Sequence, residues 1–339
     1  MAAEEFTNAH PALAEFWHPV ALSSDVGPEP VAVRIAGQGW VLARIGGQVA
    51  AFADACPHRR ARLSAGQLVE DGTLQCTYHG WRFDVDGRCV HIPALEDDAS
   101  IPERATLQRP AGVTETGGLV WLTPKPPRAP RPELDPGVPL DGDGIATVFL
   151  PVTRVEGNAA ILIDNFLDEA HFPFVHAATI GGAGPEPIPR AEIDRRGLSF
   201  TAVREHTFTN LQDPAVQDGT RPAIQRRRMT YGYQAPLTAT LLLEFLDAGG
   251  WQFITFTAQP EDARTCRLYM TVVAPGLADP DEAESTAKYE MSIVEEDLDL
   301  QRRALSGLEF PLDPAAELHT KADRVSVEFR RVLAAAVEG

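Results

Sequence analysis

The sequence predicts an α+β fold in two domains, and three observations lead to this prediction. Short segments with alternating apolar residues, separated by turn pairs such as Gly-Gly and Asp-Gly, fill the first third of the chain. Residues 123–144, TPKPPRAPRPELDPGVPLDGDG, are dense in proline, glycine and charge. Beyond them, strand-like segments are grouped apart from helical ones, which is typical of α+β domains and not of βαβ units.

An all-β domain is expected over residues 1–125, followed by a Pro-rich connection over 126–144. A chain of 339 residues exceeds what one hydrophobic core usually needs. Proline fixes φ and removes a backbone donor, so the connection is neither a helix interior nor a central strand. The expected strands lie in the segments PVAVRIAG, GWVLARIGG, QVAAFADAC, GTLQCTYHGWRFDVDGRCV and GLVWLTP.

The second domain is expected over residues 145–339. Strands are predicted in LSFTAVREHTFTN and RRRMTYGYQ, and a three-strand antiparallel meander in LTATLLLEFLDAGGWQFITFTAQPEDARTCRLYMTVVAPG. The turns of this meander are expected at residues 247–250 and 260–263. Helices are expected around residues 159–175 and 281–308.

Charge and composition exclude several classes of function. A formal net charge of −18 argues against nucleic-acid partners and anionic membranes, but suits docking of a more basic protein. The first residues lack the basic and apolar regions of a signal peptide, and no apolar run approaches the roughly 20 residues that span a bilayer. Four cysteines are not a disulfide scaffold in a chain this long, so a reducing cytoplasm is the expected location.

Two short Cys/His pairs indicate a metal centre. Cys56-x-His58 and Cys76-x-x-His79 each fit a tight loop, so each loop contributes one thiolate and one imidazole. A lone zinc would take all four ligands tetrahedrally. A Rieske [2Fe–2S] cluster takes two cysteines on one iron and two histidines on the other, and the one-of-each order in both loops favours it.

A second group of candidate ligands lies in DNFLDEAHFPFVHA, residues 164–177. Asp168 and His171 share a face of an ideal helix, whereas His176 is about 140° from His171. Pro173 would break a helical hydrogen bond and could bring His176 back towards His171. Two imidazoles and a carboxylate with open positions form the facial triad of non-haem Fe(II) oxygenases. The alternative is that these acidic and histidine side chains are ordinary helix residues that bind no metal.

The third ligand must be a carboxylate, and the segment YEMSIVEEDLDLQRRAL offers several. Counted at 100° per residue from Ile293, Asp297 falls about 40° away, inside an apolar stripe, whereas Glu296 lies on the edge of that stripe. A carboxylate in an apolar stripe needs a partner, and a metal is a suitable one. Both acids are therefore candidates, against the alternative of a solvated run of charges.

The segments CPHR…CTYHGWRFD and NFLDEAHFPFVH resemble the two metal motifs of Rieske non-haem iron oxygenases. The resemblance implies that Cys56 and Cys76 bind one iron of the cluster and that His58 and His79 bind the other. It extends over essentially the whole chain and is nearest to the vanillate O-demethylase and dicamba monooxygenase type. The fold that it implies is an N-terminal Rieske domain followed by a helix-grip catalytic domain.

The pattern N-x-x-D-x-x-H-x-x-x-x-H of that family assigns roles in the second motif. By this resemblance, His171 and His176 are expected to be ligands of a mononuclear iron, and Asn165 is expected to lie near that iron. Asp168 inherits the role of a bridge that carries electrons from a cluster histidine of one subunit to an iron ligand of the next. The third ligand of the family is an Asp on a late helix, which selects Asp297.

The resemblance also implies the activity and the partners. The chain would be the terminal oxygenase of a head-to-tail homotrimer and would insert one oxygen atom into a C–H bond of a small organic substrate, by hydroxylation or oxidative demethylation. Electrons from NAD(P)H would come from a separate reductase, directly or through a ferredoxin, since the sequence shows no dinucleotide or flavin motif. The alternatives are cis-dihydroxylation or desaturation on the same scaffold, a Rieske electron carrier without catalysis, and a zinc-stapled scaffold protein.

Other candidate side chains carry less weight. Cys89 and Cys266 lack a partner at a ligand spacing and are expected to be buried as small apolar residues. His91 is expected to be structural or on the surface. Four apolar side chains around the second motif could equally line a pocket or pack in the core: Phe166, Phe172, Phe174 and Ile180.

Overall fold

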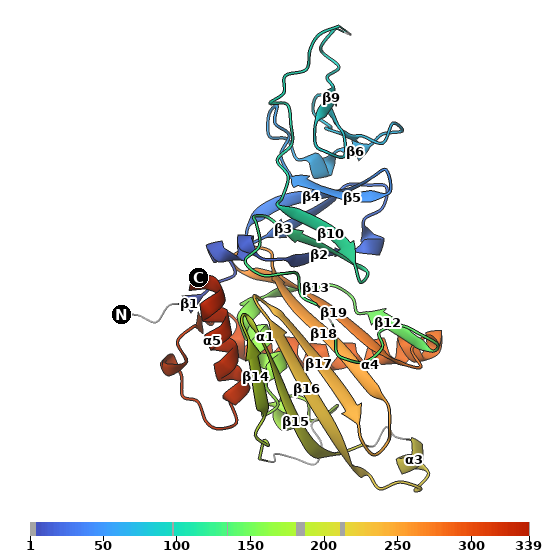
Figure 1. The fold of residues 1–339 in the computed structure, drawn as a ribbon, viewed down its shortest axis with the longest axis vertical. Coiled ribbons are helices and arrows are strands. Elements are labelled where there is room, and N and C mark those ends of the chain that lie inside the picture. The colour runs from blue at the N-terminus through green and yellow to red at the C-terminus, as the bar shows by residue number, and fades with distance from the viewer. Residues whose placement is uncertain (1–4, 97, 134, 181–186, 211–213, 339) are drawn as a thin grey trace. The chain divides into compact units, whose positions relative to one another are not determined.

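The computed structural model describes residues 5–96, 98–133, 135–180, 187–210 and 214–338. The chain divides into two compact units. One comprises residues 9–131 and 259–263, and the other comprises residues 1–8, 132–258 and 264–339. Both units contain antiparallel sheets, and all the α-helices lie in the second unit (Figure 1). The predicted α+β fold is confirmed, whereas the domain limits 1–125, 126–144 and 145–339 stay predictions.

The first unit consists of three small sheets. The strand orders are β3-β4-β5, β10-β11-β2 and β6-β7-β8-β9. Paired glycines close one of its two-residue hairpins, where Gly46 and Gly47 both adopt positive φ between β4 and β5. The strands are β2 His18–Leu22, β3 Val31–Ile35, β4 Gln38–Ile45, β5 Gln48–Ala53, β6 Gln67–Leu68, β7 Leu74–Gln75, β8 Arg82–Phe83, β9 Cys89–His91, β10 Gly112–Thr116 and β11 Leu119–Thr123. Single 3₁₀ turns span Pro11–Glu15, Ser23–Asp25 and Leu63–Ala65.

The second unit is built on one large sheet with the strand order β12-β19-β18-β17-β16-β15-β14, in which β13 also pairs with β19. Its strands are β12 Ile145–Phe149, β13 Thr153–Glu156, β14 Glu192–Arg196, β15 Ser199–Thr209, β16 Ile224–Gln234, β17 Thr238–Phe245, β18 Trp251–Pro260 and β19 Thr265–Pro275. The predicted meander is therefore formed by β17, β18 and β19. A short pair, β1 Glu5–Phe6 with β20 Phe310–Pro311, completes the unit.

The helices of the second unit are α1 Ala159–Leu167, α2 Phe172–Val175, α3 Pro214–Gln217, α4 Pro280–Leu300 and α5 Arg324–Glu338. Asn158 begins α1 by accepting the backbone N–H of Ala160, and Asp279 begins α4 by accepting two backbone N–H groups. α1 and α4 lie against the same face of the sheet (Figure 1). No helix in the described ranges has the length and apolar character needed to cross a bilayer.

Two expectations about helices need correction. The stretch around 159–175 is not one helix kinked at Pro173, because α1 already ends at Leu167 and Pro173 lies in the first turn of the separate helix α2. The late helix does not continue in α form to residue 308: α4 ends at Leu300 and a π-helical turn, Gln301–Leu305, follows. α5 was not anticipated.

Candidate active site

In the first unit, the two Cys/His loops have the same backbone geometry. The N–H of Cys56 donates to the carbonyl of Ala61 at 2.8 Å, and the carbonyl of Cys56 accepts from the N–H of Arg60 at 2.8 Å. The second loop repeats these bonds at the same offsets, from Cys76 N–H to Trp81 at 2.8 Å and from the N–H of the following glycine, residue 80, to Cys76 at 3.0 Å. The residue four positions after each cysteine has positive φ, a conformation that glycine adopts freely and Arg60 adopts with strain.

The two cysteines and the two histidines predicted to bind the cluster lie in different surroundings. Both cysteines are buried and lie beside each other, whereas both histidines are exposed, with ring centroids 4.4 Å apart. Burial raises the pKa of the Cys56 thiol to about 11, so a bound cation is needed to hold it as a thiolate. Buried thiols on one side and exposed imidazoles on the other fit the two unlike irons of a Rieske cluster.

A single zinc fits these loops less well. Around one zinc, ligand atoms lie about 2.0–2.3 Å from the metal and therefore close to one another. Within the described ranges, the one group of three or more potential ligands whose atoms lie within 4.8 Å of one another is His171, His176 and Asp297 in the second unit. The Cys/His ligands are thus spread more widely than a mononuclear site requires, as a two-iron cluster demands.

In the second unit, Asp168 shapes the first half of the iron motif. It ends α1 with extended backbone angles, and its carboxylate then accepts the backbone N–H groups of Ala170 and His171, each at 3.1 Å. The chain turns there, which places His171 at the entrance of α2 and His176 at its end. The change of direction that brings the two histidines together therefore comes mainly from Asp168.

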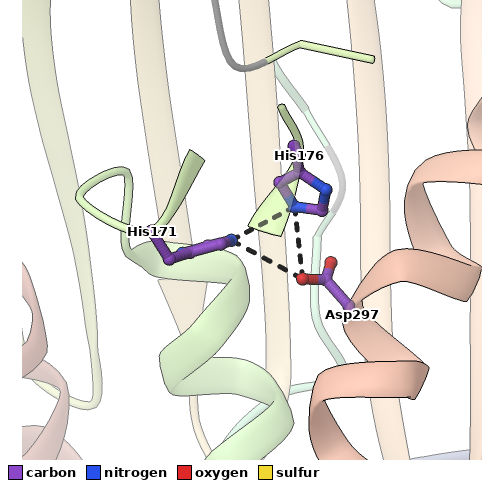
Figure 2. Close-up of side chains that lie close together, drawn as sticks. All are labelled: His171, His176 and Asp297. Atoms are coloured by element: carbon purple, nitrogen blue, oxygen red, sulfur yellow. Dashed lines mark hydrogen bonds and ion pairs between the residues drawn. The ribbon is translucent and has the colours of Figure 1, made fainter. Parts of the chain in front are cut away.

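His171, His176 and Asp297 converge from two elements. Figure 2 shows the histidines on the α2 segment pointing towards Asp297 on α4. The two Nε2 atoms lie 3.2 Å apart. Asp297 Oδ1 lies 3.5 Å from Nε2 of His171 and 3.2 Å from Nε2 of His176.

The outer nitrogen of each histidine faces a carboxylate. His171 Nδ1 lies 2.9 Å from Asp168 Oδ2, and His176 Nδ1 lies 2.8 Å from Glu296 Oε2. Because an ionised carboxylate only accepts hydrogen bonds, both Nδ1 atoms carry a proton, which leaves Nε2 of each ring as the nitrogen that can bind a metal. The two Nε2 atoms and a carboxylate oxygen thus meet at one point, an arrangement that suits a bound cation. These donor atoms fit the facial triad of a non-haem iron.

A metal and a proton compete for His171. Burial lowers the pKa of His171, but hydrogen bonds to Asp168 and Asp297 outweigh it and raise this pKa to about 9, so a metal that binds Nε2 displaces a proton. Burial acts to raise the pKa of Asp297 and of Asp168, but their hydrogen bonds with the histidines bring both pKa values below the usual range. Both carboxylates are therefore ionised at neutral pH, as a metal site requires.

A cavity of about 890 Å³ opens beside the triad. Its size falls in the usual range for a small-molecule site. Alternate residues of β16 to β19 line one side because side chains on one face of a strand recur every second residue. Most of the lining is apolar or aromatic, and the members used below are Phe166, Leu243, Phe256, Tyr289, Ile293 and Val294.

The predicted residues divide as follows in the structure. Asn165, Phe166, Phe172 and Ile180 line the cavity, whereas Phe174 is exposed. His91 is exposed, and both remaining cysteines, 89 and 266, are buried. The alternative third ligand, Glu296, lies behind His176 and does not face the other two ligand atoms.

A buried charged pair that the sequence did not reveal lies beside the iron motif. Arg204 Nε is 3.2 Å from Glu169 Oε1, and both side chains are 3% exposed. His206, 3.7 Å from the same carboxylate, has its pKa lowered to about 4 by burial and by the neighbouring arginines. Glu169 follows Asp168 directly, so this pair anchors the turn that carries the iron motif.

Both units match known protein families. Residues 16–107 match the family described as the Rieske [2Fe-2S] domain, and residues 155–339 match the vanillate O-demethylase oxygenase C-terminal domain. Methylxanthine N3-demethylase NdmB of Pseudomonas putida is 27% identical over 329 residues, which cover 94% of this chain and 88% of that protein. The oxygenase subunit of 5,5'-dehydrodivanillate O-demethylase of Sphingobium is 31% identical over 58% of this chain and 48% of that protein.

Solved structures show the same fold. The structure of Pseudomonas putida NdmB superposes with a TM-score of 0.78 at 25% identity and covers 97% of this chain and 91% of that chain. Dicamba monooxygenase bound to dicamba superposes with a TM-score of 0.77 at 22% identity, covering 98% of both chains. At that identity the second likeness supports the fold alone.

Proposed function

The chain belongs to the Rieske oxygenases with a catalytic domain of the vanillate O-demethylase type, and from this premise we propose that it removes a methyl group from a small aromatic substrate by O2-dependent oxidation. The family membership confirms the expected [2Fe–2S] cluster, the mononuclear iron and the oxidoreductase class. The observation that carries the proposal is the convergence of two histidines and an aspartate at the wall of an aromatic-lined cavity.

The proposed ligands follow from the donor atoms described above. Cys56, His58, Cys76 and His79 would hold the cluster, and His171, His176 and Asp297 the iron. When bound, these groups supply the electrons and the site for O2 reduction. The residues of the chain keep the two imidazoles in one tautomer, through Asp168 and Glu296, and keep bulk water from the reacting group through the apolar lining.

The overall reaction balances with one molecule of O2, two electrons and two protons. One oxygen atom enters a C–H bond of an O-methyl or N-methyl group and the other leaves as water. The hydroxymethyl product collapses to formaldehyde and a free hydroxyl or amine. The demethylases among the relatives support this outcome over cis-dihydroxylation.

Partners and location are part of the same proposal. We expect NAD(P)H electrons to arrive from a separate reductase, directly or through a ferredoxin, and a basic docking face would complement the charge of −18. Asp168 would carry electrons to His171 within a head-to-tail homotrimer, and a cytoplasmic location suits free thiols.

The test measures metal content and product in the same preparation. Anaerobically purified protein should contain about three irons and two sulfides per chain. After chemical reduction, exposure to O2 with a panel of methoxybenzenes should release formaldehyde in proportion to substrate consumed. A cis-diol without formaldehyde would replace demethylation by dihydroxylation, and zinc without sulfide would contradict the whole assignment.

A further inference from the structure

The cavity wall contains a carboxyl group that neither the triad nor its hydrogen-bond partners use. Glu290 lies on α4, is only 6% exposed and lines the cavity. It precedes Asp297 by seven residues, two helical turns, and therefore projects from nearly the same face of the helix, about 10 Å away along the axis. Helical periodicity thus places a second acid in the cavity at a fixed distance from the triad.

The partners of Glu290 leave part of its hydrogen-bonding capacity open. Its Oε1 accepts from Gln252 Nε2 at 2.7 Å. Within the described part of the chain, its side chain forms no further hydrogen bond and no ion pair. Since even a protonated carboxyl group keeps acceptor capacity beyond this one bond, Glu290 can still take a donor from within the cavity.

The surroundings of Glu290 favour binding of a ligand that carries such a donor. Gln252 pairs with Leu243 across the strands, and Ile293 and Val294 follow Glu290 on the helix, so apolar side chains border the polar pair. Burial raises the pKa of Glu290, against the hydrogen bond from Gln252. A ligand that donates a hydrogen bond to this carboxyl group satisfies it away from bulk water, whereas a ligand of the same shape without the donor leaves it unpaired.

The distance between the two sites limits the ligand. A molecule with its reacting group at the triad and a donor at Glu290 must bridge about 10 Å, less the contact distances at both ends. One aromatic ring with substituents at opposite ends fits this gap. Phe166 and Phe256 stack at 4.8 Å between centroids and, with Tyr289, supply aromatic surface to hold it.

We propose that Glu290 and Gln252 form a substrate-recognition subsite that selects aromatic molecules with a hydrogen-bond donor, a phenolic O–H or a ring N–H, opposite the methyl group that reacts. The statement that the methyl end of the substrate reacts rests on the proposed function. Recognition of the donor does not rest on it, because binding can be measured without any reaction.

The test compares matched ligands that differ by one donor. Two probe pairs are used: 4-methoxyphenol with 1,4-dimethoxybenzene, and 5-methoxyindole with 5-methoxy-1-methylindole. Binding to the iron-loaded holoenzyme is measured by calorimetry without O2. In each pair, the probe with the O–H or N–H donor should bind about 10- to 100-fold more tightly than its methylated partner. This is the range expected for a hydrogen bond to a buried group.

Variants assign the preference to the subsite. Glu290→Leu combined with Gln252→Leu replaces both polar partners by apolar groups and should remove the preference in both pairs. Glu290→Gln keeps the shape and a carbonyl acceptor, presents a donor of its own, and should reduce the preference even if the double variant folds poorly. Glu295→Gln, an exposed change on the same helix, should leave it intact.

Two results would overturn the subsite. One is equal affinity within both wild-type pairs, which includes no binding of any of the four probes. The other is a preference that persists in the Glu290 variants. Failure of the proposed function gives a different result. If the enzyme forms products without formaldehyde, demethylation is wrong but the binding preference for the donor can still be present. If the binding preference is absent but formaldehyde is released, the subsite is wrong and demethylation stands.

Discussion

Glu296 Oε2 lies 2.8 Å from His176 Nδ1, on the side of the ring away from the other two proposed iron ligands. The same oxygen accepts a hydrogen bond from Thr179 Oγ1 at 2.7 Å. Asp168 holds His171 in the same way. Each proposed ligand histidine is thus fixed in orientation and tautomer by a carboxylate behind it, an arrangement common around metal sites.

We predict that Glu296→Ala weakens Fe(II) binding at the triad by about 10- to 100-fold, because the imidazole of His176 loses the acceptor that orients it. The measurement is an Fe(II) titration of protein with an intact cluster and an emptied mononuclear site. Glu295→Ala, one position earlier and exposed, serves as the control. Equal affinity in the two variants would show that Glu296 does not position His176.

Asp297→Ala should empty the mononuclear site and leave the cluster in place. The substitution removes one of three donor atoms, and two imidazoles alone do not form a facial triad. Iron should fall from about three to about two per chain, with sulfide and visible absorption unchanged. Retention of the third iron would move the carboxylate ligand to a different residue, with Glu296 the first to examine.

Asp168→Asn should keep both metal centres but lower turnover at least about 10-fold. The amide oxygen can still accept the backbone N–H and the Nδ1–H of His171, and only the bond from the Ala170 N–H is lost, so the iron motif keeps most of its shape. It lacks the negative charge that stabilises the proton on His171 Nδ1. Iron and sulfide are counted first, then product formation and cluster re-oxidation are followed in single-turnover reactions. Wild-type rates would remove the bridging role.

Glu169→Gln should destabilise the second unit by about 3–5 kcal/mol, because it leaves the buried guanidinium of Arg204 without its counter-charge. Chemical denaturation followed by far-ultraviolet circular dichroism measures this change, because the α-helices lie in the second unit. The matched control is Asp194→Asn, which breaks an exposed pair with Arg196 and should cost at most about 1 kcal/mol. Similar losses in both variants would show that burial of the Glu169 pair contributes nothing.

The sequence predicted the ligand types better than the geometry that assembles them. Cys/His spacing and the His171/His176 pattern are local, so they can be recognised in a single stretch of sequence. The reversal that joins the histidines depends on side-chain hydrogen bonds of Asp168 to the backbone, and proline is the more conspicuous signal nearby. The break was therefore expected at Pro173 and lies earlier.

Other features were not predicted, some because a local signal was overlooked and some because they depend on long-range packing. α5 has apolar residues at helical spacing from Val325 to Val337, a signal that was present but not used. The lining of the cavity depends on the register of β16 to β19, which no local pattern encodes. Glu290 could have been suspected, since it lies two turns before Asp297, but its contact with Gln252 joins elements 38 residues apart.

Acid sensitivity of the first unit should come from His18. Burial lowers its pKa from 6.5 to about 4, while its Nε2 lies 2.8 Å from the carbonyl of Leu13. The unfolded chain binds the proton below pH 6.5 and the folded chain only near pH 4, so stability is fully present above pH 6.5 and falls as the pH drops between these values. At pH 5 the loss should be about 2 kcal/mol.

The variant His18→Gln tests this assignment, because glutamine can donate to the same carbonyl without titrating. Thermal loss of the cluster's visible absorption is compared at pH 7 and pH 5 for both proteins. The wild type should melt at a lower temperature at pH 5, and the variant should lose much less of its stability over that range. An equal fall in both proteins would place the acid-sensitive group elsewhere, since no other change separates them.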